Sequence, residues 1–184
     1  MLPHRRYILV TGLIALSIVL ALLNKWSSSP RAEGERREQH GLIRIDKSAI
    51  RQDDGDTFFY RGLTIRILGM DTPEIVHKEH GIFEDQPYGR KAAAMTADAL
   101  KKAGVVEYLP FRNDTYGRVL AHVFVDGELL AVRLIRAGLA YETISYYGDN
   151  GFPKLAERIL KAARESPRPP FERPYRWRRK HQIK

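Results

Sequence analysis

The sequence contains no cysteine, and this single absence removes several classes of chemistry. A disulfide-bonded scaffold, a thiol nucleophile, an iron–sulfur cluster and a cysteine-based zinc site are all excluded. Histidine is also sparse, with six residues scattered along the chain, which argues against a zinc enzyme built on imidazole ligands. Any metal that this protein binds is therefore expected to be held by oxygen atoms.

The rest of the composition is that of an ordinary globular protein with a basic surface. Hydrophobic residues make up 43% and charged residues 29% of the 184 residues, which argues against wholesale disorder, collagen or a simple coiled coil. Lys and Arg number 31 against 22 Asp and Glu, so the formal net charge is +9. Such a surface attracts polyanions, and nucleic acid is the first candidate.

Residues 1–26 differ from the rest of the chain. Arg5 and Arg6 precede an apolar stretch, Ile8–Leu23, which is the pattern of an export signal or of a membrane anchor. No small-residue cleavage site follows, and Trp26 stands where an interfacial anchor is found, so an uncleaved anchor helix is favoured over a cleaved signal peptide. The charges on the two sides of the stretch leave its orientation in the membrane open.

The remaining chain divides into a linker, a folded body and a tail. Residues 27–40 are charged and poorly apolar, which is typical of a tether. Residues 41–166 carry the apolar periodicity of a domain. The tail, residues 167–184, holds seven Lys or Arg and one Glu, and its prolines predict that it forms no regular helix. Two interpretations of the tail remain open, a segment that contacts nucleic acid or anionic lipid, and a solvated end packed only through its aromatic residues.

Alternating apolar residues and turn signals place strands and helices within the body. The expected strands are Leu42–Ile50, Thr57–Tyr60, Leu63–Leu68, Val105–Phe111 and Val119–Val125, and the expected helices are Tyr88–Ala103, Glu128–Ala137 and Gly151–Ser166. This order predicts a small β-barrel covered by helices.

Three short segments concentrate carboxylates and arginines. They read DGDT at 54–57, RILGMDTPE at 66–74 and DTYGR at 114–118. Each segment alone is most simply a turn. Together, in this order and at these separations, they resemble the staphylococcal nuclease (thermonuclease) family, and the resemblance covers residues 42–166. It implies an α+β fold, a five-stranded OB-fold β-barrel with three helices, here preceded by the N-terminal signal-anchor or transmembrane helix.

The resemblance also assigns roles to individual residues. It implies that Ca²⁺ is bound by the carboxylates of Asp56 and Asp71 and by the backbone carbonyl of Thr72. Glu74 corresponds to the proposed general base. The remaining positions bind the substrate: Arg66 and Arg118 grip the scissile phosphate, Tyr116 binds a phosphate, and Tyr146, with Tyr147, follows Ile144, where the family has a tyrosine.

The chemistry of this set is coherent without the family name. Carboxylate and carbonyl oxygens are the ligands that Ca²⁺ prefers. Arginine suits a phosphate clamp because its planar fork makes bidentate contacts and keeps its charge. A carboxylate such as Glu74 accepts a proton from an attacking water.

Other polar residues have two readings each. His77 and His80, with Glu79, are either a metal-binding pair or part of a solvated loop. His122 either approaches the substrate or packs within its strand. Asp53 and Asp54 either support the metal ligands or only form the turn.

The resemblance therefore implies a Ca²⁺-dependent endonuclease that acts on single-stranded DNA and RNA and leaves 3′-phosphate ends. It is expected to be a monomer without a protein partner, anchored to a membrane through residues 1–26 and facing outside the cytoplasm, or secreted or periplasmic if that segment is cleaved. Two alternatives remain. One is a non-catalytic OB-fold module that binds nucleic acid, and the other is an envelope scaffold whose tail binds anionic lipid.

Overall fold

The computed structural model describes residues 41–183. The expected signal anchor at residues 1–26 and the linker at 27–40 therefore lie outside the described residues. Among the described residues, no helix is both long enough and apolar enough to cross a bilayer.

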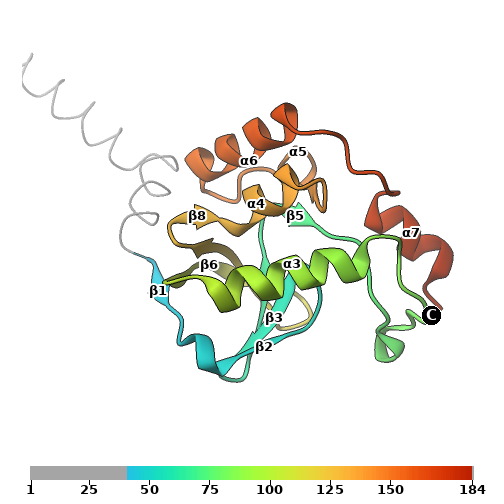
Figure 1. Cartoon of the computed structure of the whole chain (residues 1–184), viewed down its shortest axis with the longest axis horizontal. Coiled ribbons are helices and arrows are strands. Elements are labelled where there is room, and N and C mark those ends of the chain that lie inside the picture. Colours follow the sequence, from blue (N-terminus) through green and yellow to red (C-terminus); the bar gives the residue numbers. More distant parts are fainter. Residues whose placement is uncertain (1–40, 184) are drawn as a thin grey trace, which may run out of the picture.

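The described chain forms a curled sheet with helices packed around it (Figure 1). The strands are β1 (Ile43–Arg44), β2 (Ile50–Gln52), β3 (Thr57–Tyr60), β4 (Leu63–Ile67), β5 (Met70–Asp71), β6 (Val106–Asn113), β7 (Val119–Val125), β8 (Glu128–Leu129) and β9 (Tyr141–Glu142). The α-helices are α3 (Gly89–Lys102), α4 (Leu130–Arg136), α5 (Ile144–Tyr147), α6 (Pro153–Glu165) and α7 (Pro174–His181), and two 3₁₀ turns are η1 (Lys47–Ala49) and η2 (Lys78–His80).

The pairing of the strands brings the acidic and basic motifs together. The main sheet has the order β1-β6-β7-β4-β3-β2, with β8 added beside β7, and a small second sheet pairs β5 with β9. Neighbouring strands run antiparallel except β4 and β7, which are parallel. Thr57 on β3 lies opposite Arg66 on β4, and Arg66 in turn lies beside Leu120 on β7. The 54–57 turn, Arg66 and the β7 hairpin are therefore adjacent in space.

The core lies between the sheet and the helices. Phe58, Ile65 and Val123 from the sheet are completely buried, as are Leu134 of α4 and Ile159 of α6. Figure 1 shows α4 and α6 on one side of the sheet and α3 running across it, while α7 stands apart from them, beside the segment that joins β5 to α3. This architecture is the α+β, OB-like arrangement that the sequence predicts.

Most of the expected elements are present, with one strand divided. The predicted strand Leu42–Ile50 is wrong as a single element, because η1 separates β1 from β2. Asp46 causes the break, since its side chain accepts a hydrogen bond from the backbone N–H of Ser48 (3.1 Å) and so caps the 3₁₀ turn. Short strands such as β1, β2 and β8 join the main sheet, so it has more than the five strands expected. Helices α5 and α7 are additional to the three helices expected.

The prediction that the tail forms no helix is also wrong, because residues 174–181 form α7. Pro174 occupies the first turn of this helix, where its missing N–H has no intrahelical partner to lose and its fixed φ suits the helix. The prolines within residues 167–170 lie in the non-helical segment that precedes α7. Pro174 therefore starts a helix, whereas the prediction treated it as a helix breaker.

His122 belongs to the core rather than to a substrate site. Its side chain is 1% exposed, packs edge-on against Phe152 with ring centroids 5.2 Å apart, and has no hydrogen-bond partner for either ring nitrogen. Burial, with a smaller contribution from Arg158, lowers its pKa to about 3. The packed-strand interpretation is confirmed.

Replacing His122 should therefore flatten the pH dependence of stability. The unfolded chain binds a proton at His122 below about pH 6.5, whereas the folded chain does not until about pH 3, so acidification favours unfolding across this window. The wild type should lose about 1.4 kcal/mol per pH unit there through this group, and His122→Leu should remove that component. Urea unfolding at several pH values measures it, and equal slopes in both proteins contradict the assignment.

Candidate functional site

The DGDT turn places Asp56 at the start of β3. The backbone N–H of Asp56 donates to Asp54 Oδ1 (2.9 Å), which closes the turn locally. Gly55 is needed because a Cβ at this position would lie 2.6 Å from the hydroxyl oxygen of Thr72. The carbonyl of Gly55 accepts a hydrogen bond from the Thr96 hydroxyl (2.6 Å). The turn is therefore packed tightly against the segment that follows β5, and Asp56 is buried there.

Arg66 links the two aspartates that the sequence predicts as metal ligands. Its Nη1 donates to Asp56 Oδ1 (2.5 Å) and its Nη2 to Asp71 Oδ1 (3.1 Å). The second oxygen of Asp56 accepts from the backbone N–H of Thr72 (3.2 Å). Burial alone would lower the pKa of Arg66, but the surrounding carboxylates outweigh it and raise that pKa, so the guanidinium stays charged.

Glu74 is positioned by a buried glutamine. Gln86 donates its backbone N–H to the carbonyl of Glu74 (2.9 Å), and its side-chain oxygen accepts from the Glu74 N–H (3.2 Å). Its amide nitrogen donates to the carbonyl of Glu172 in the C-terminal segment (2.6 Å). Gly89 allows the close approach, since a Cβ there would collide with the Glu74 carbonyl. The segment between β5 and α3 is therefore tied both to itself and to the tail.

Arg178 on α7 enters the same cluster, and the sequence analysis missed it. Its Nη1 forms an ion pair with Glu74 Oε1 and lies 3.4 Å from Asp71 Oδ1. The concentration of Lys and Arg in the tail did not distinguish one arginine from another, whereas the helical spacing of Arg178 from Pro174 would have placed it on the inner face of a helix. The structure therefore brings Asp56, Arg66, Asp71, Thr72, Glu74 and Arg178 together.

The C-terminal segment reaches this place through specific contacts. The Tyr141 hydroxyl donates to the carbonyl of Phe171 (2.7 Å), and the side chains of Phe171 and Trp177 are buried. At the far end of α7, the N–H of Ile183 donates to the carbonyl of Gly81 (2.9 Å). The burial of Phe171 and Trp177 is the aromatic packing that the second interpretation expects, but the bond from Ile183 shows that the segment is not held by its aromatic residues alone.

The buried carboxyl groups suit a hard cation. Burial raises the pKa of Asp71 and of Glu74 despite the nearby Arg178, and burial together with Asp56 raises the pKa of Asp54 well above its usual range. An additional positive charge nearby would therefore stabilise the ionised form of each of these carboxyl groups. The available donors around Asp56 and Asp71 are carboxylate and carbonyl oxygens, which fit Ca²⁺ or Mg²⁺ and not a soft metal.

Arg118 lies on the β6–β7 hairpin and not in the cluster. Asp114 holds its Nε and Nη2 at 2.8 Å each, and its guanidinium lies over the ring of Tyr116, 5.4 Å from the centroid. No hydrogen bond or ion pair joins Arg118 to Asp56, Asp71 or Glu74 in the described chain. Asp114 therefore orients its guanidinium just before β7, the strand that pairs with β4, which carries Arg66.

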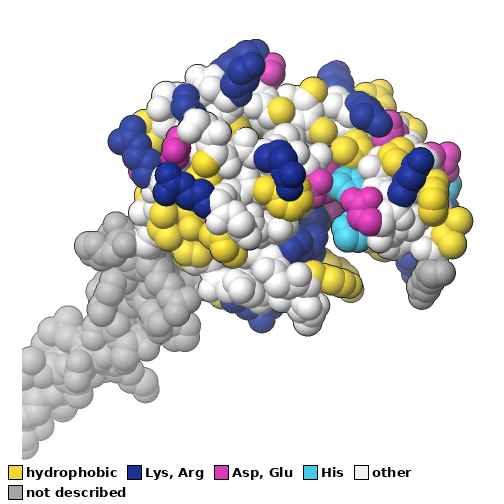
Figure 2. All heavy atoms as spheres, turned by 90° about the horizontal axis from the view of Figure 1, so that it is seen from below, with side chains coloured by type: hydrophobic (Ala, Val, Ile, Leu, Met, Phe, Trp, Pro, Cys, Tyr) yellow, Lys and Arg dark blue, Asp and Glu magenta, His cyan; other side chains and the backbone are white. Residues whose placement is uncertain are grey.

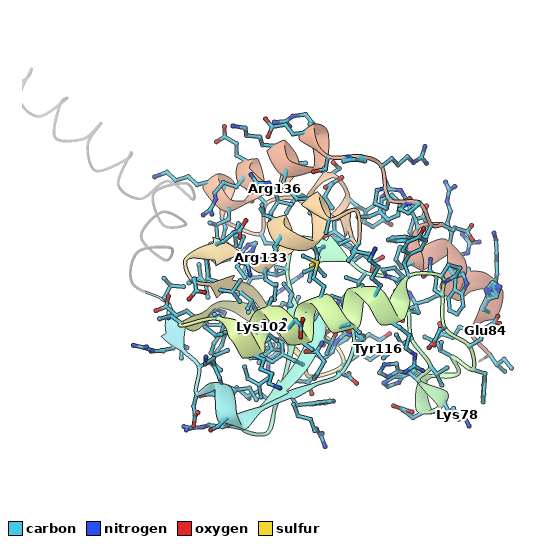
Figure 3. All side chains as sticks on the ribbon, viewed as in Figure 1. Lys78, Glu84, Lys102, Tyr116, Arg133 and Arg136 are labelled. Atoms are coloured by element: carbon cyan, nitrogen blue, oxygen red, sulfur yellow. The ribbon has the colours of Figure 1, made fainter. Side chains whose placement is uncertain are left out.

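The expected aromatic contacts are available to a ligand. Tyr116 and Tyr146 are each 84% exposed, and Tyr147 is 69% exposed. Tyr116, labelled in Figure 3, projects from the tip of the β6–β7 hairpin. Large apolar rings that face water in this way are suited to stacking on bases.

The loop that carries His77, Glu79 and His80 is only partly exposed to solvent. Glu79 and His80 are exposed, but His77 is buried, with its Nε2 3.8 Å from Asp53 Oδ1 and its Nδ1 3.5 Å from Glu79 Oε1. The solvated-loop interpretation is therefore wrong for His77, because the loop folds back onto the 54–57 turn. Within the described residues, potential ligand atoms lie within 4.8 Å of one another in two groups, His77, Glu79 and His80, and Asp53, Asp54 and His77. Figure 2 shows histidine and acidic side chains side by side on this face.

Comparison with known proteins agrees with the site. Residues 64–167 match the family model described as "Staphylococcal nuclease homologue". The chain is 32% identical to a protein named thermonuclease from Staphylococcus hyicus, over 86% of this chain and 92% of that protein. It is 29% identical to a thermonuclease of Staphylococcus intermedius, over 85% and 94% of the two chains, and 32% identical to endonuclease YncB of Bacillus subtilis, over 68% and 64%.

Removing the side chain of Gln86 should loosen the site and destabilise the protein. Gln86→Ala leaves the Glu74 N–H and the Glu172 carbonyl without their buried partners, which should cost about 2–4 kcal/mol of unfolding free energy. Urea unfolding measures the loss, and hydrogen exchange at the Glu74 amide should speed up. The control is Gln182→Ala, which removes an exposed glutamine bonded to the His80 carbonyl and should cost less than about 1 kcal/mol. Equal effects of the two substitutions would contradict the role given to Gln86.

Proposed function

We propose a specific reaction for this chain, which belongs to the staphylococcal nuclease family and is a nuclease. The protein is a Ca²⁺-dependent endonuclease that hydrolyses phosphodiester bonds of single-stranded DNA and RNA and leaves 3′-phosphate ends. One observation carries the proposal: Arg66 lies between the buried carboxylates of Asp56 and Asp71, with the carboxylate of Glu74 in the same cluster.

Asp56, Asp71 and the carbonyl of Thr72 would hold the cation. Two carboxylates and one carbonyl leave several of the 6–8 positions that Ca²⁺ uses for water and substrate, which suggests weak binding, on the order of 10⁻⁴–10⁻³ M. When bound, Ca²⁺ polarises the phosphoryl oxygen and helps to place the attacking water.

The remaining steps belong to the side chains of this protein. Glu74 orients a water molecule through Oε1 or Oε2 and accepts its proton as the oxygen attacks phosphorus. Arg66 donates from its fork to the non-bridging oxygens, on which negative charge grows in the transition state. Arg118, held by Asp114, approaches the same phosphate from the hairpin. The 5′ oxygen departs in line and takes a proton from solvent water to become a hydroxyl, which leaves the phosphate on the 3′ side.

Exposed rings and positive charge support a single-stranded substrate. Tyr116 and Tyr146 offer faces on which any base stacks, and this contact tolerates sequence variation. The net charge of +9 attracts the phosphate backbone, and Figure 2 shows Lys and Arg side chains distributed over the face in view. Binding should therefore weaken as salt is raised.

We also propose that residues 1–26 anchor a monomeric enzyme outside the cytoplasm, or direct it there if they are cleaved. Two features of the sequence support this, the paired arginines and the apolar run that follows them. Calcium is more abundant outside cells, which suits a site of weak affinity.

Cleavage of a labelled single-stranded DNA tests the proposed function. The wild type should cut the DNA in millimolar Ca²⁺, should stop when a chelator is added, and should yield 3′-phosphate ends. Glu74→Gln is nearly isosteric but cannot accept the proton, so turnover should fall by about 10²–10⁴-fold. Binding without cleavage in Ca²⁺ and in Mg²⁺ would instead support the alternative of a non-catalytic OB-fold module.

Removing Arg118 separates its role from general surface charge. Arg118→Ala should lower kcat/KM by about 10²-fold, because a donor to the transition-state phosphate is lost. Arg112→Ala removes an equal charge from the same hairpin, where Arg112 is exposed over the ring of Phe111, and should change kcat/KM by less than about threefold. Near-normal cleavage by Arg118→Ala would remove it from the phosphate clamp.

A further inference from the structure

We infer that Arg178 is a phosphate-binding residue of the active site, so that the C-terminal helix α7 supplies part of the binding site for the scissile phosphodiester. This inference rests on the proposed function and adds a third arginine to it. The matched family region ends at residue 167, so α7 lies beyond that region.

Two guanidinium groups from distant parts of the chain meet at one oxygen. Arg66 Nη2 lies 3.1 Å and Arg178 Nη1 3.4 Å from the same atom, Asp71 Oδ1. Arg178 Nη1 also pairs with Glu74, the carboxylate proposed to activate the water. Arg178 therefore stands beside the position at which the attacking water and the phosphate have to meet.

The fork of Arg178 has donors left for a ligand. Both of its side-chain contacts use Nη1, so Nε and Nη2 make no hydrogen bond to any of the residues that the structure describes. The side chain is 29% exposed, compared with 21% for Arg66, so solvent and substrate reach it. A planar fork with free donors at the edge of a carboxylate site suits the non-bridging oxygens of a phosphodiester.

The partners of Arg178 are the groups that a bound cation changes. In the described structure its only acidic partners are Asp71, which is proposed to hold the cation, and Glu74, which is proposed to bind the water. An oxygen of Asp71 that binds a divalent ion attracts a guanidinium less strongly. The substrate phosphate then becomes the remaining strong anion within reach of the fork.

The docking of α7 makes this placement specific. Trp177, the neighbour of Arg178, is buried, and the ends of the segment are bonded to the body at Phe171 and at Ile183. The adjacent Arg179 is exposed and makes no ion pair in the described chain. Of two neighbouring arginines on one short helix, only Arg178 therefore lies within the carboxylate cluster.

Arg179 supplies a matched control for the test. Cleavage of a labelled single-stranded DNA in Ca²⁺ is followed for the full chain and for Arg178→Ala, Arg178→Lys and Arg179→Ala. Arg178→Ala should lower kcat/KM by about 10²-fold, and Arg179→Ala should change it by less than about threefold. Arg178→Lys should recover part of the loss, because it restores the charge but not the fork.

A salt series provides a readout that a merely structural role would not change. The slope of log kcat/KM against log salt should become shallower by about 0.7 in Arg178→Ala, as expected for one lost phosphate contact with a single strand, and should stay unchanged in Arg179→Ala. Thermal unfolding of each variant records whether α7 remains docked. If Arg178→Ala is destabilised, the kcat/KM and the salt slope of Arg178→Lys test the phosphate contact in its place.

Three results would overturn the inference. Equal losses in Arg178→Ala and Arg179→Ala would show only diffuse attraction by a basic helix. Faster cleavage by Arg178→Ala would show that the helix blocks the site. An unchanged salt slope in Arg178→Ala would assign Arg178 a structural role. Absence of cleavage by the wild type in Ca²⁺ would be a different failure, because it overturns the proposed function itself.

Discussion

The burial of Asp56 and Asp71 around Arg66 is the constraint on which the rest of the site depends. Carboxylates removed from water are costly unless they are paired and hydrogen-bonded, and here the guanidinium groups of Arg66 and Arg178 and the backbone N–H of Thr72 satisfy them. The pairing of β3 with β4 provides the geometry, and Gly55 provides the space for Thr72. An arrangement that costs stability in this way is typical of a place where charge is needed for chemistry.

The sequence predicted the part of the site that is local in the chain. Asp56, Arg66 and Asp71 lie at the ends of consecutive short strands, so their spacing and the strand pattern already bring them together. Arg178 was not predicted, because it is 104 positions from Glu74 and reaches it only after the tail docks on the body. Helical spacing places Arg178 one turn after the buried Pro174, so a helix predicted over the tail would have favoured Arg178 over Arg179 as the inward arginine.

The remaining errors have two origins, helix-start and capping effects that act locally, and one tertiary contact. Proline at the first turn of α7 was read as a helix breaker, since only its position relative to the helix start decides which role it takes. The solvated-loop reading fails for His77 because the loop folds back onto Asp53, a contact that the sequence does not show. The strand predicted at 42–50 was divided by a single capping side chain, that of Asp46. Core elements with strong alternation, such as β7, were predicted correctly.

In the proposed mechanism, the carboxylate–arginine cluster binds a cation and a phosphodiester together. Calorimetric titration of Ca²⁺, with and without a single-stranded oligonucleotide made uncleavable by modified linkages, measures this coupling directly. We expect weak Ca²⁺ binding to the protein alone, on the order of 10⁻⁴–10⁻³ M, tighter binding when the oligonucleotide is present, and loss of both in Asp71→Asn. Calcium binding that ignores the oligonucleotide, or that persists in Asp71→Asn, would contradict it.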